Sequence, residues 1–181
     1  MIDRVLKGVC RRSPVVSRLA WRTVDVSVIT SSGRTGTQFL AWMLRQVGVH
    51  SVHEPSPDLF NESVAKHRHD ENVVGGIRRK RPPSFELLRD GKYVESNWNL
   101  ITLLDEADEV FGGAKISFIV RNFYDYVESA LNKSPDGSGD MFFYGQNDHR
   151  SRLTATDFGE MSEKEWENLH RAEKIAWWWT T

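Results

Sequence analysis

The stretch "VDVSVITSSGRTGTQFLAWMLRQVGVH", residues 24–50, decides the fold. Its first seven residues are mostly β-branched, which is typical of a buried strand in a parallel sheet. Small residues follow over 31–36, and a helical periodicity then places five apolar side chains on one face of 37–47: Phe39, Leu40, Met43, Leu44 and Val47. A strand, a small-residue loop and a helix in this order predict a loop that grips a phosphate group.

The rest of the chain alternates between strand and helix patterns. Strands are predicted at 49–54, 92–98 and 115–120. Helices are predicted at 100–111, at 124–132, from Ser162 onward, and once or twice within 57–92. This alternation indicates an α/β protein with a parallel sheet and right-handed crossovers. Residues 133–161 are predicted to form a long loop, and such loops are functional lids or disordered segments.

Composition limits the class of protein. A chain of 181 residues with a formal net charge of −1 fits one domain, and it is no polycation that seeks nucleic acid. Its single cysteine, Cys10, excludes an intrachain disulfide, and no apolar run reaches the length of a membrane span. We therefore expect a cytoplasmic protein, with a basic N-terminal extension over 1–23 and an α/β domain over 24–181.

The loop after the first strand has the chemistry of an anion site. Gly33 and Gly36 allow backbone N–H groups to approach a phosphate, and the helix that starts near Thr37 adds its positive end. Hydroxyl groups of Ser32, Thr35 and Thr37 and the guanidinium of Arg34 add donors. An ATP-binding loop would carry Lys-Ser or Lys-Thr where Thr37-Gln38 stands, so no metal is expected. A Ser/Gly-rich turn without a ligand is the alternative reading.

A second candidate segment is "KISFIVRNFYDYVESALN", residues 115–132. It places Arg121 at the carboxyl end of a strand and Ser129 eight residues later on a helix, where the two side chains could clamp one phosphate group. The alternative is an arginine at the sheet edge and a serine on a solvated helix face.

Together the two segments resemble the sulfotransferase family. "SGRTGTQFL" is similar to its 5′-phosphosulfate loop, "IVRNFYDYVES" to its 3′-phosphate motif, and "AEKIAWWW" to its Lys-x-Ala-Trp-x-Trp helix. The resemblance covers about residues 24–179. Phe123 stands where the family usually has Pro, and Gln38 where a second Thr is common. The family's next strand and its adenine-covering loop are expected to be missing, so the three-layer P-loop-like fold would be truncated at its C-terminus.

The resemblance implies transfer of a sulfonate from 3′-phosphoadenosine 5′-phosphosulfate to an acceptor hydroxyl or amine, without a metal. It assigns the 5′-phosphate to residues 32–38 (Ser32, Gly33, Arg34, Thr35, Gly36, Thr37 and Gln38) and the 3′-phosphate to Arg121 and Ser129. Arg34 would neutralise the leaving phosphate and the SO₃ group in transit. The general base would be Glu54, then Glu95, then His53, because the comparable stretch "YVESNWNL" has no histidine.

Several questions stay open from the sequence. A nucleotide-binding or anion-binding module without catalysis and a P-loop kinase relative are the alternatives to an enzyme of this family. The acceptor is a small molecule, a glycan or a lipid, selected by the loop that carries Phe142, Phe143, Tyr144 and His149. "RRKR" (78–81) is an exposed basic turn, a steering surface or a nucleic-acid patch, and "HRHDE" (67–71) is a weak metal signal against a solvated helix. The apolar run 177–179 needs cover from this domain, a partner or missing chain.

Overall fold

The structure, a computed structural model, describes residues 2–133 and 152–181. Its centre is a four-stranded, all-parallel sheet in the order β2-β3-β1-β4. The strands are β1 (Asp25–Thr30), β2 (Ser51–His53), β3 (Lys92–Ser96) and β4 (Lys115–Phe118). The predicted α/β class with a parallel sheet is confirmed, and all four strands point their carboxyl ends at the same edge.

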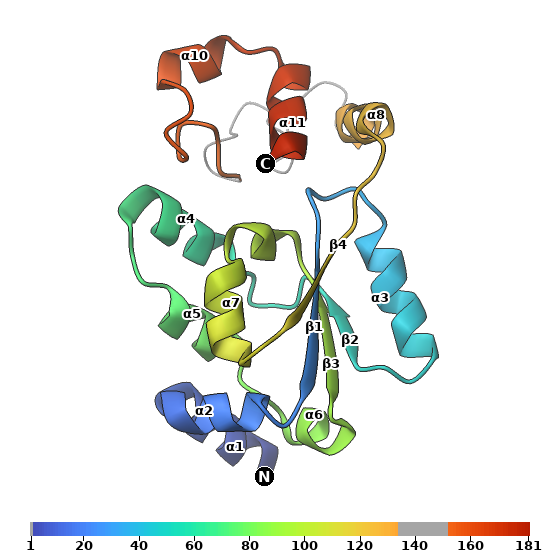
Figure 1. Cartoon of the computed structure of the whole chain (residues 1–181), viewed down its shortest axis with the longest axis vertical. Coiled ribbons are helices and arrows are strands. Elements are labelled where there is room, and N and C mark those ends of the chain that lie inside the picture. The colour runs from blue at the N-terminus through green and yellow to red at the C-terminus, as the bar shows by residue number, and fades with distance from the viewer. Residues whose placement is uncertain (1, 134–151) are drawn as a thin grey trace.

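Helices lie on both faces of the sheet and at both of its ends (Figure 1). In chain order they are α1 (Ile2–Arg12), α2 (Pro14–Trp21), α3 (Thr37–Gln46), α4 (Phe60–His69), α5 (Val74–Lys80), α6 (Phe85–Asp90), the 3₁₀ helix η1 (Trp98–Thr102), α7 (Leu104–Phe111), α8 (Phe123–Lys133), α10 (Glu163–Asn168) and α11 (Arg171–Thr180). The segment 57–92 thus holds three helices rather than one or two.

The main core lies between the sheet and the α5–α7 side. Val26 and Val28 of β1 pack there with Ile77 and Phe111, and Trp21 of α2 belongs to the same cluster. The Trp21 and Phe111 rings meet edge to face, with centroids 4.9 Å apart. The expected division near residue 24 is therefore not a structural boundary, because α2 supplies part of the core. α1 and α2 lie at the amino-terminal end of the sheet (Figure 1).

The opposite face of the sheet is covered less completely. α3 contacts β2 and β3, but its predicted apolar stripe is only partly covered, because Leu40 and Leu44 are half-buried and the other three members are exposed. Phe39 and Val47 are 62% and 75% exposed, whereas Thr37 and Ala41 are buried. β4 is an edge strand, and all four of its residues are exposed.

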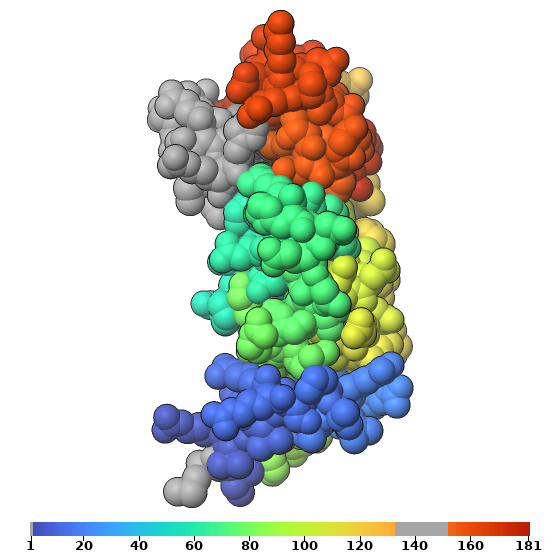
Figure 2. Space-filling model, turned by 90° about the vertical axis from the view of Figure 1, so that its left-hand side faces the viewer, coloured from blue at the N-terminus to red at the C-terminus, as the bar shows by residue number. Residues whose placement is uncertain are grey.

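The C-terminal segment packs with α8 and η1 in a second core. It lies at the end of the molecule opposite to α1 and α2 (Figure 2). The predicted capping box of Ser162 and Glu165 is present, but the helix that it opens ends at Asn168. His170 and Glu173 form another capping box, which starts α11 and satisfies its first N–H groups. One long helix was therefore the wrong expectation.

Candidate functional site

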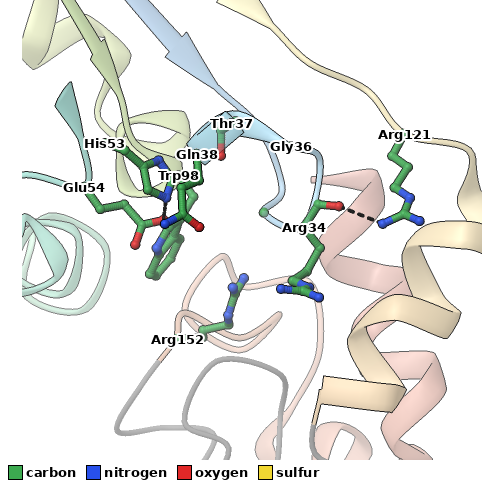
Figure 3. Close-up of a pocket in the computed structure, with 10 residues that line it drawn as sticks. Arg34, Gly36, Thr37, Gln38, His53, Glu54, Trp98, Arg121 and Arg152 are labelled. Atoms are coloured by element: carbon green, nitrogen blue, oxygen red, sulfur yellow. Dashed lines mark hydrogen bonds and ion pairs between the residues drawn. The ribbon is translucent and has the colours of Figure 1, made fainter. Parts of the chain in front are cut away.

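One pocket opens where the four parallel strands end (Figure 3). Its volume is about 420 Å³. Each strand contributes at or beyond its carboxyl end: β1 through the following loop and the start of α3 (within 33–38), β2 through its last residue His53 and the adjacent Glu54, β3 through Trp98 and β4 through Arg121. Arg152 completes the lining. Ligands of open parallel sheets bind at this edge, so the site lies where the fold predicts one.

The loop after β1 has the backbone of an anion cradle. Gly33, Arg34 and Gly36 all have positive φ angles, of 90°, 54° and 89°. Left-handed residues of this kind occur in backbone concavities whose N–H groups bind anions. Gly36 is also the N-cap residue of α3, whose first turn begins at Thr37 beside the pocket. The positive end of a ten-residue helix therefore adds to the site.

The two segments singled out in the sequence meet at Arg34. Its Nε donates to Ser129 Oγ at 3.2 Å, and its carbonyl oxygen accepts from Arg121 Nη1 at 3.1 Å. Both arginines line the same pocket, although they are 87 residues apart in the chain. The neighbouring positions of β1 and β4, with Thr30 opposite Phe118, bring their loops together.

Helix α11 fixes both segments from above. Trp178 Nε1 and the Tyr126 hydroxyl donate to the Ser32 carbonyl oxygen at 2.9 and 3.1 Å, and Trp179 Nε1 donates to the Arg121 carbonyl oxygen at 3.1 Å. Burial raises the pKa of Tyr126 above its ordinary value of 10, so its hydroxyl remains a donor.

The tryptophan run 177–179 receives its cover from within the domain. Trp178 is 1% exposed, and Trp177 Nε1 donates to Glu160 Oε2 at 2.6 Å. The three indoles therefore contact different partners within the domain; Trp178 is buried, whereas Trp177 and Trp179 are half-buried. Through Trp178 and Trp179, helix α11 therefore holds the loop after β1 and the segment after β4 in place.

His53 and Glu54 form the acid–base part of the lining. His53 Nε2 lies 3.5 Å from Glu54 Oε1, and His53 Nδ1 lies 3.4 Å from Ser96 Oγ. Glu54 has a φ angle of 43°, one of three positive values at non-glycine residues in the described chain, and Arg34 in the same pocket has another. Such backbone strain collects at functional sites.

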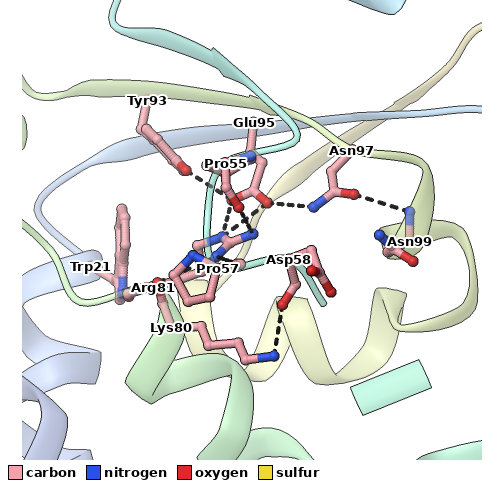
Figure 4. A network of polar contacts seen from close by, with 10 residues as sticks. All are labelled: Trp21, Pro55, Pro57, Asp58, Lys80, Arg81, Tyr93, Glu95, Asn97 and Asn99. Carbon is pink, nitrogen blue, oxygen red and sulfur yellow. Dashed lines mark hydrogen bonds and ion pairs between the residues drawn. The ribbon is translucent and has the colours of Figure 1, made fainter. Parts of the chain in front are cut away.

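Glu95, predicted as a possible general base, does not line this pocket, and its surroundings do not suit that role. It is fully buried, and both carboxylate oxygens accept from Arg81 Nε at 3.0 and 2.9 Å (Figure 4). The Tyr93 hydroxyl and Asn97 Nδ2 donate to the same carboxylate at 2.8 and 2.9 Å. Burial and the charge of Glu95 raise the pKa of Tyr93, which keeps that hydroxyl protonated. A carboxylate so occupied takes a structural role.

The surroundings of Arg81 bear on the basic stretch 78–81, for which an exposed turn, a steering surface and a nucleic-acid patch were the alternatives. Its guanidinium is buried, and besides Glu95 it donates to the carbonyl oxygens of Pro57 and Pro55 at 2.7 and 3.1 Å. Lys80 pairs with Glu62 at 2.6 Å. Residues 78–80 thus belong to helix α5 and Arg81 is buried, which contradicts an exposed basic turn. In the "HRHDE" stretch, His67 stacks on Phe158 with ring centroids 4.7 Å apart.

Three predicted binding residues do not line the pocket. The Ser32 carbonyl oxygen accepts from Tyr126 and Trp178, and the Ser129 hydroxyl accepts from Arg34 rather than from Arg121. The Thr35 hydroxyl is buried and has no hydrogen-bond partner within the part of the chain that the structure describes. The members that do line it are Gly33, Arg34, Gly36, Thr37, Gln38, Arg121, His53 and Glu54.

Two lining residues were missed in the sequence, Trp98 and Arg152. Trp98 lies just beyond β3 and is the last residue of the predicted strand 92–98, so its place at a predicted strand end was the available signal; Arg152 had none. The acceptor-selecting residues Phe142, Phe143, Tyr144 and His149 lie outside the described residues. The end of the same predicted loop, from Leu153 to Ala155, is buried rather than open.

Fold and site together define an α/β protein with a cationic pocket at the carboxyl edge of a parallel sheet. Comparisons of the chain with protein-family models, with curated proteins and with solved structures found no match. Over the described residues, none of the helices has the length and apolar character needed to cross a bilayer. Any narrower assignment depends on the chemistry of the pocket.

Proposed function

We propose that the chain is a sulfotransferase of P-loop-like fold, which moves a sulfonate group from 3′-phosphoadenosine 5′-phosphosulfate to an acceptor hydroxyl or amine. The observation that supports this most is the shared pocket of Arg34 and Arg121, joined by the 3.1 Å hydrogen bond from Arg121 to the Arg34 carbonyl. These residues come from the two segments that resemble the family's 5′- and 3′-phosphate motifs, and one doubly phosphorylated ligand would account for both.

The proposed roles follow from position. The N–H groups of the cradle and the amino end of α3 hold the 5′-phosphate, because they form the concave side of the pocket. Arg34, oriented by Ser129, neutralises charge on the bridging oxygen as the bond to sulfur breaks. Arg121 binds the 3′-phosphate. A sulfonate carries a single charge, so positioning and fixed cations supply most of the rate enhancement.

The transfer itself requires a proton acceptor. The acceptor oxygen forms a bond to sulfur, the bond from sulfur to the 5′-phosphate oxygen breaks, and adenosine 3′,5′-bisphosphate leaves. The hydroxyl proton passes to Glu54 or His53, the two titratable side chains besides the arginines among the described lining residues. We place Glu54 first, with His53 beside it at 3.5 Å to receive or orient the proton.

Isothermal titration with adenosine 3′,5′-bisphosphate and with Mg²⁺–ATP tests the binding half of the proposal, and sulfonate transfer to a panel of hydroxyl and amine acceptors tests the catalytic half. We expect tighter binding of the bisphosphate and transfer to at least one acceptor. Bisphosphate binding without turnover would instead support a non-catalytic nucleotide-binding module. Mg²⁺-dependent preference for ATP would support a P-loop kinase relative.

A further inference from the structure

Arg152 is the pocket residue that no motif marks. Its side chain is almost completely buried, at 1% exposure, and lies between two indoles. The guanidinium carbon is 4.5 Å from the centroid of the Trp98 ring and 5.1 Å from that of Trp178. The two rings meet nearly at right angles, at 78°, and form a corner for the planar cation. Guanidinium groups stack well on indoles, and stacking on two of them fixes the side chain.

The Arg152 guanidinium lies close to the loop after β1. Arg152 Nη2 lies 3.5 Å from the point where a Cβ would stand on Gly33. In Figure 3 it lies between Trp98 and Arg34, across the loop from Arg121. Trp178 contributes twice to this arrangement, because it also donates to the Ser32 carbonyl oxygen next to Gly33. The position of Arg152 is thus tied to that of the loop.

Charge adds to the argument from position. Three guanidiniums and one carboxylate line the pocket in the described chain: Arg34, Arg121, Arg152 and Glu54. A buried, preorganised cation exerts a stronger field than one in water, and it costs no reorganisation when a ligand arrives. Its field reaches Tyr126, where the Arg152 charge opposes the effect of burial on the pKa. The loop end of the pocket therefore suits a ligand group with more than one negative charge.

We propose that Arg152 is a second anion-binding guanidinium at the loop end, which holds the 5′-phosphate or phosphosulfate group against Arg34. This inference rests on the proposed donor site and names a residue for its 5′ end. Trp98 and Trp178 hold the guanidinium in place. Arg121 remains the residue of the 3′ end, so the two arginines read different phosphates of one nucleotide.

The test compares Arg152→Met with Arg121→Met and with the control Arg79→Met, an exposed arginine of α5 outside the pocket. Affinities are measured for AMP, adenosine 3′-monophosphate and inorganic pyrophosphate. Arg152→Met should weaken AMP and pyrophosphate by about 10- to 100-fold and leave the 3′-monophosphate unchanged, as expected for loss of a charged hydrogen bond. Arg121→Met should reverse the two nucleotide effects, and Arg79→Met should change neither.

Equal AMP affinity in wild type and Arg152→Met, or equal loss for both nucleotides, overturns the assignment. If Arg152→Met lacks a cooperative thermal transition, Arg152→Lys decides, because it keeps the charge but loses the planar stack. Lysine should cost AMP affinity about five-fold or more, and no change would count against the proposal. Failure of sulfonate transfer leaves the pyrophosphate comparison intact, whereas a wild-type chain that binds no pyrophosphate removes the Arg152 site as well.

Discussion

Two arginine clusters lie near the carboxyl ends of the same strands, and they differ in how their charge is balanced. Around Arg81, the carboxylate of Glu95 and the carbonyl oxygens of Pro55 and Pro57 accept from the guanidinium. Around Arg34, three guanidiniums share a hollow with one carboxylate, that of Glu54. The first cluster has the composition of a structural support, and the second has the composition of a site that receives an anion.

Their contact partners make the same distinction. The Arg81 cluster joins β3 to the segment after β2, and Trp21 Nε1 donates to the Arg81 carbonyl oxygen at 3.2 Å (Figure 4). The pocket cluster is held mainly through backbone oxygens, those of Ser32, Arg34 and Arg121. Anchoring through the backbone fixes the loops and leaves side chains to face a ligand. Residue type alone does not separate the two roles.

The largest effect should come from the structural cluster. Glu95→Gln removes the charge that compensates a buried guanidinium, and we expect a loss of about 3–5 kcal/mol in the free energy of unfolding. Urea titration measures it, with the exposed Glu109→Gln of α7 as a control. The double variant Arg81→Met with Glu95→Leu should recover a large part of the loss. A cost for Glu95→Gln no greater than that of the control would contradict the structural role.

The pocket cluster should fail in function rather than in stability. Arg34→Ala removes the cation nearest the cradle, and sulfonate transfer should fall by about 10²–10³-fold or become unmeasurable. The unfolding free energy should change much less than in Glu95→Gln, because the side chain of Arg34 is exposed. Transfer rates and urea curves of the same preparation check both statements. Full activity in Arg34→Ala would remove this residue from the mechanism.

Arg121→Ala should sharpen the comparison within the pocket. We expect adenosine 3′,5′-bisphosphate to lose about 10- to 100-fold in affinity, and AMP to lose little, since only the bisphosphate carries a 3′-phosphate. Isothermal titration with both nucleotides gives the ratio directly. An equal loss for the two ligands would mean that Arg121 acts through the loop, by its bond to the Arg34 carbonyl, rather than on the phosphate.

The smallest effect should come from helix α11, which contacts the Arg121 segment through Trp179. Trp179→Phe deletes the indole N–H that holds the Arg121 carbonyl oxygen, but it keeps an aromatic ring against Phe123. A lost hydrogen bond of this kind costs about 1 kcal/mol, and bisphosphate affinity should fall several-fold more than AMP affinity. Trp42→Phe, at an exposed position of α3, is the matched control. Identical behaviour of the two variants would show that α11 does not position Arg121.

The sequence predicted the elements better than their faces. The strand 24–30 and the helix 37–47 correspond to β1 and α3 within a residue. Three of the five side chains marked by the apolar periodicity, Phe39, Met43 and Val47, are nevertheless exposed, because periodicity identifies a stripe without saying which neighbour covers it. The three helices within 57–92 were only partly predicted. Their polar composition reflects ion pairs such as Lys80 with Glu62, which a pattern of apolar residues cannot reveal.

Candidate site residues were predictable where they lie at or after the end of a predicted strand. Arg34, Glu54 and Arg121 each follow a strand, His53 is the last residue of β2, and all four line the pocket. Glu95 lies at a strand end as well, but it faces Arg81, since side chains alternate between the two faces of a sheet. Position in the sequence does not distinguish Glu95 from the four lining residues. The distinction requires the order of the strands and the face of the sheet on which each side chain lies.

The amino-acid sequence by itself determined the alternation of strands and helices, the small-residue loop after β1 and its glycines, because these depend on local backbone preference and periodicity. Tertiary structure alone decided that Arg34, Arg121 and Arg152 share one pocket while Arg81 does not. The residues next to each arginine in the sequence do not determine which arginines share a pocket. The pairing of β1 with β4 and the packing of α11 bring residues together that are distant in the chain. The balance of charge in each cluster is therefore a property of the folded chain.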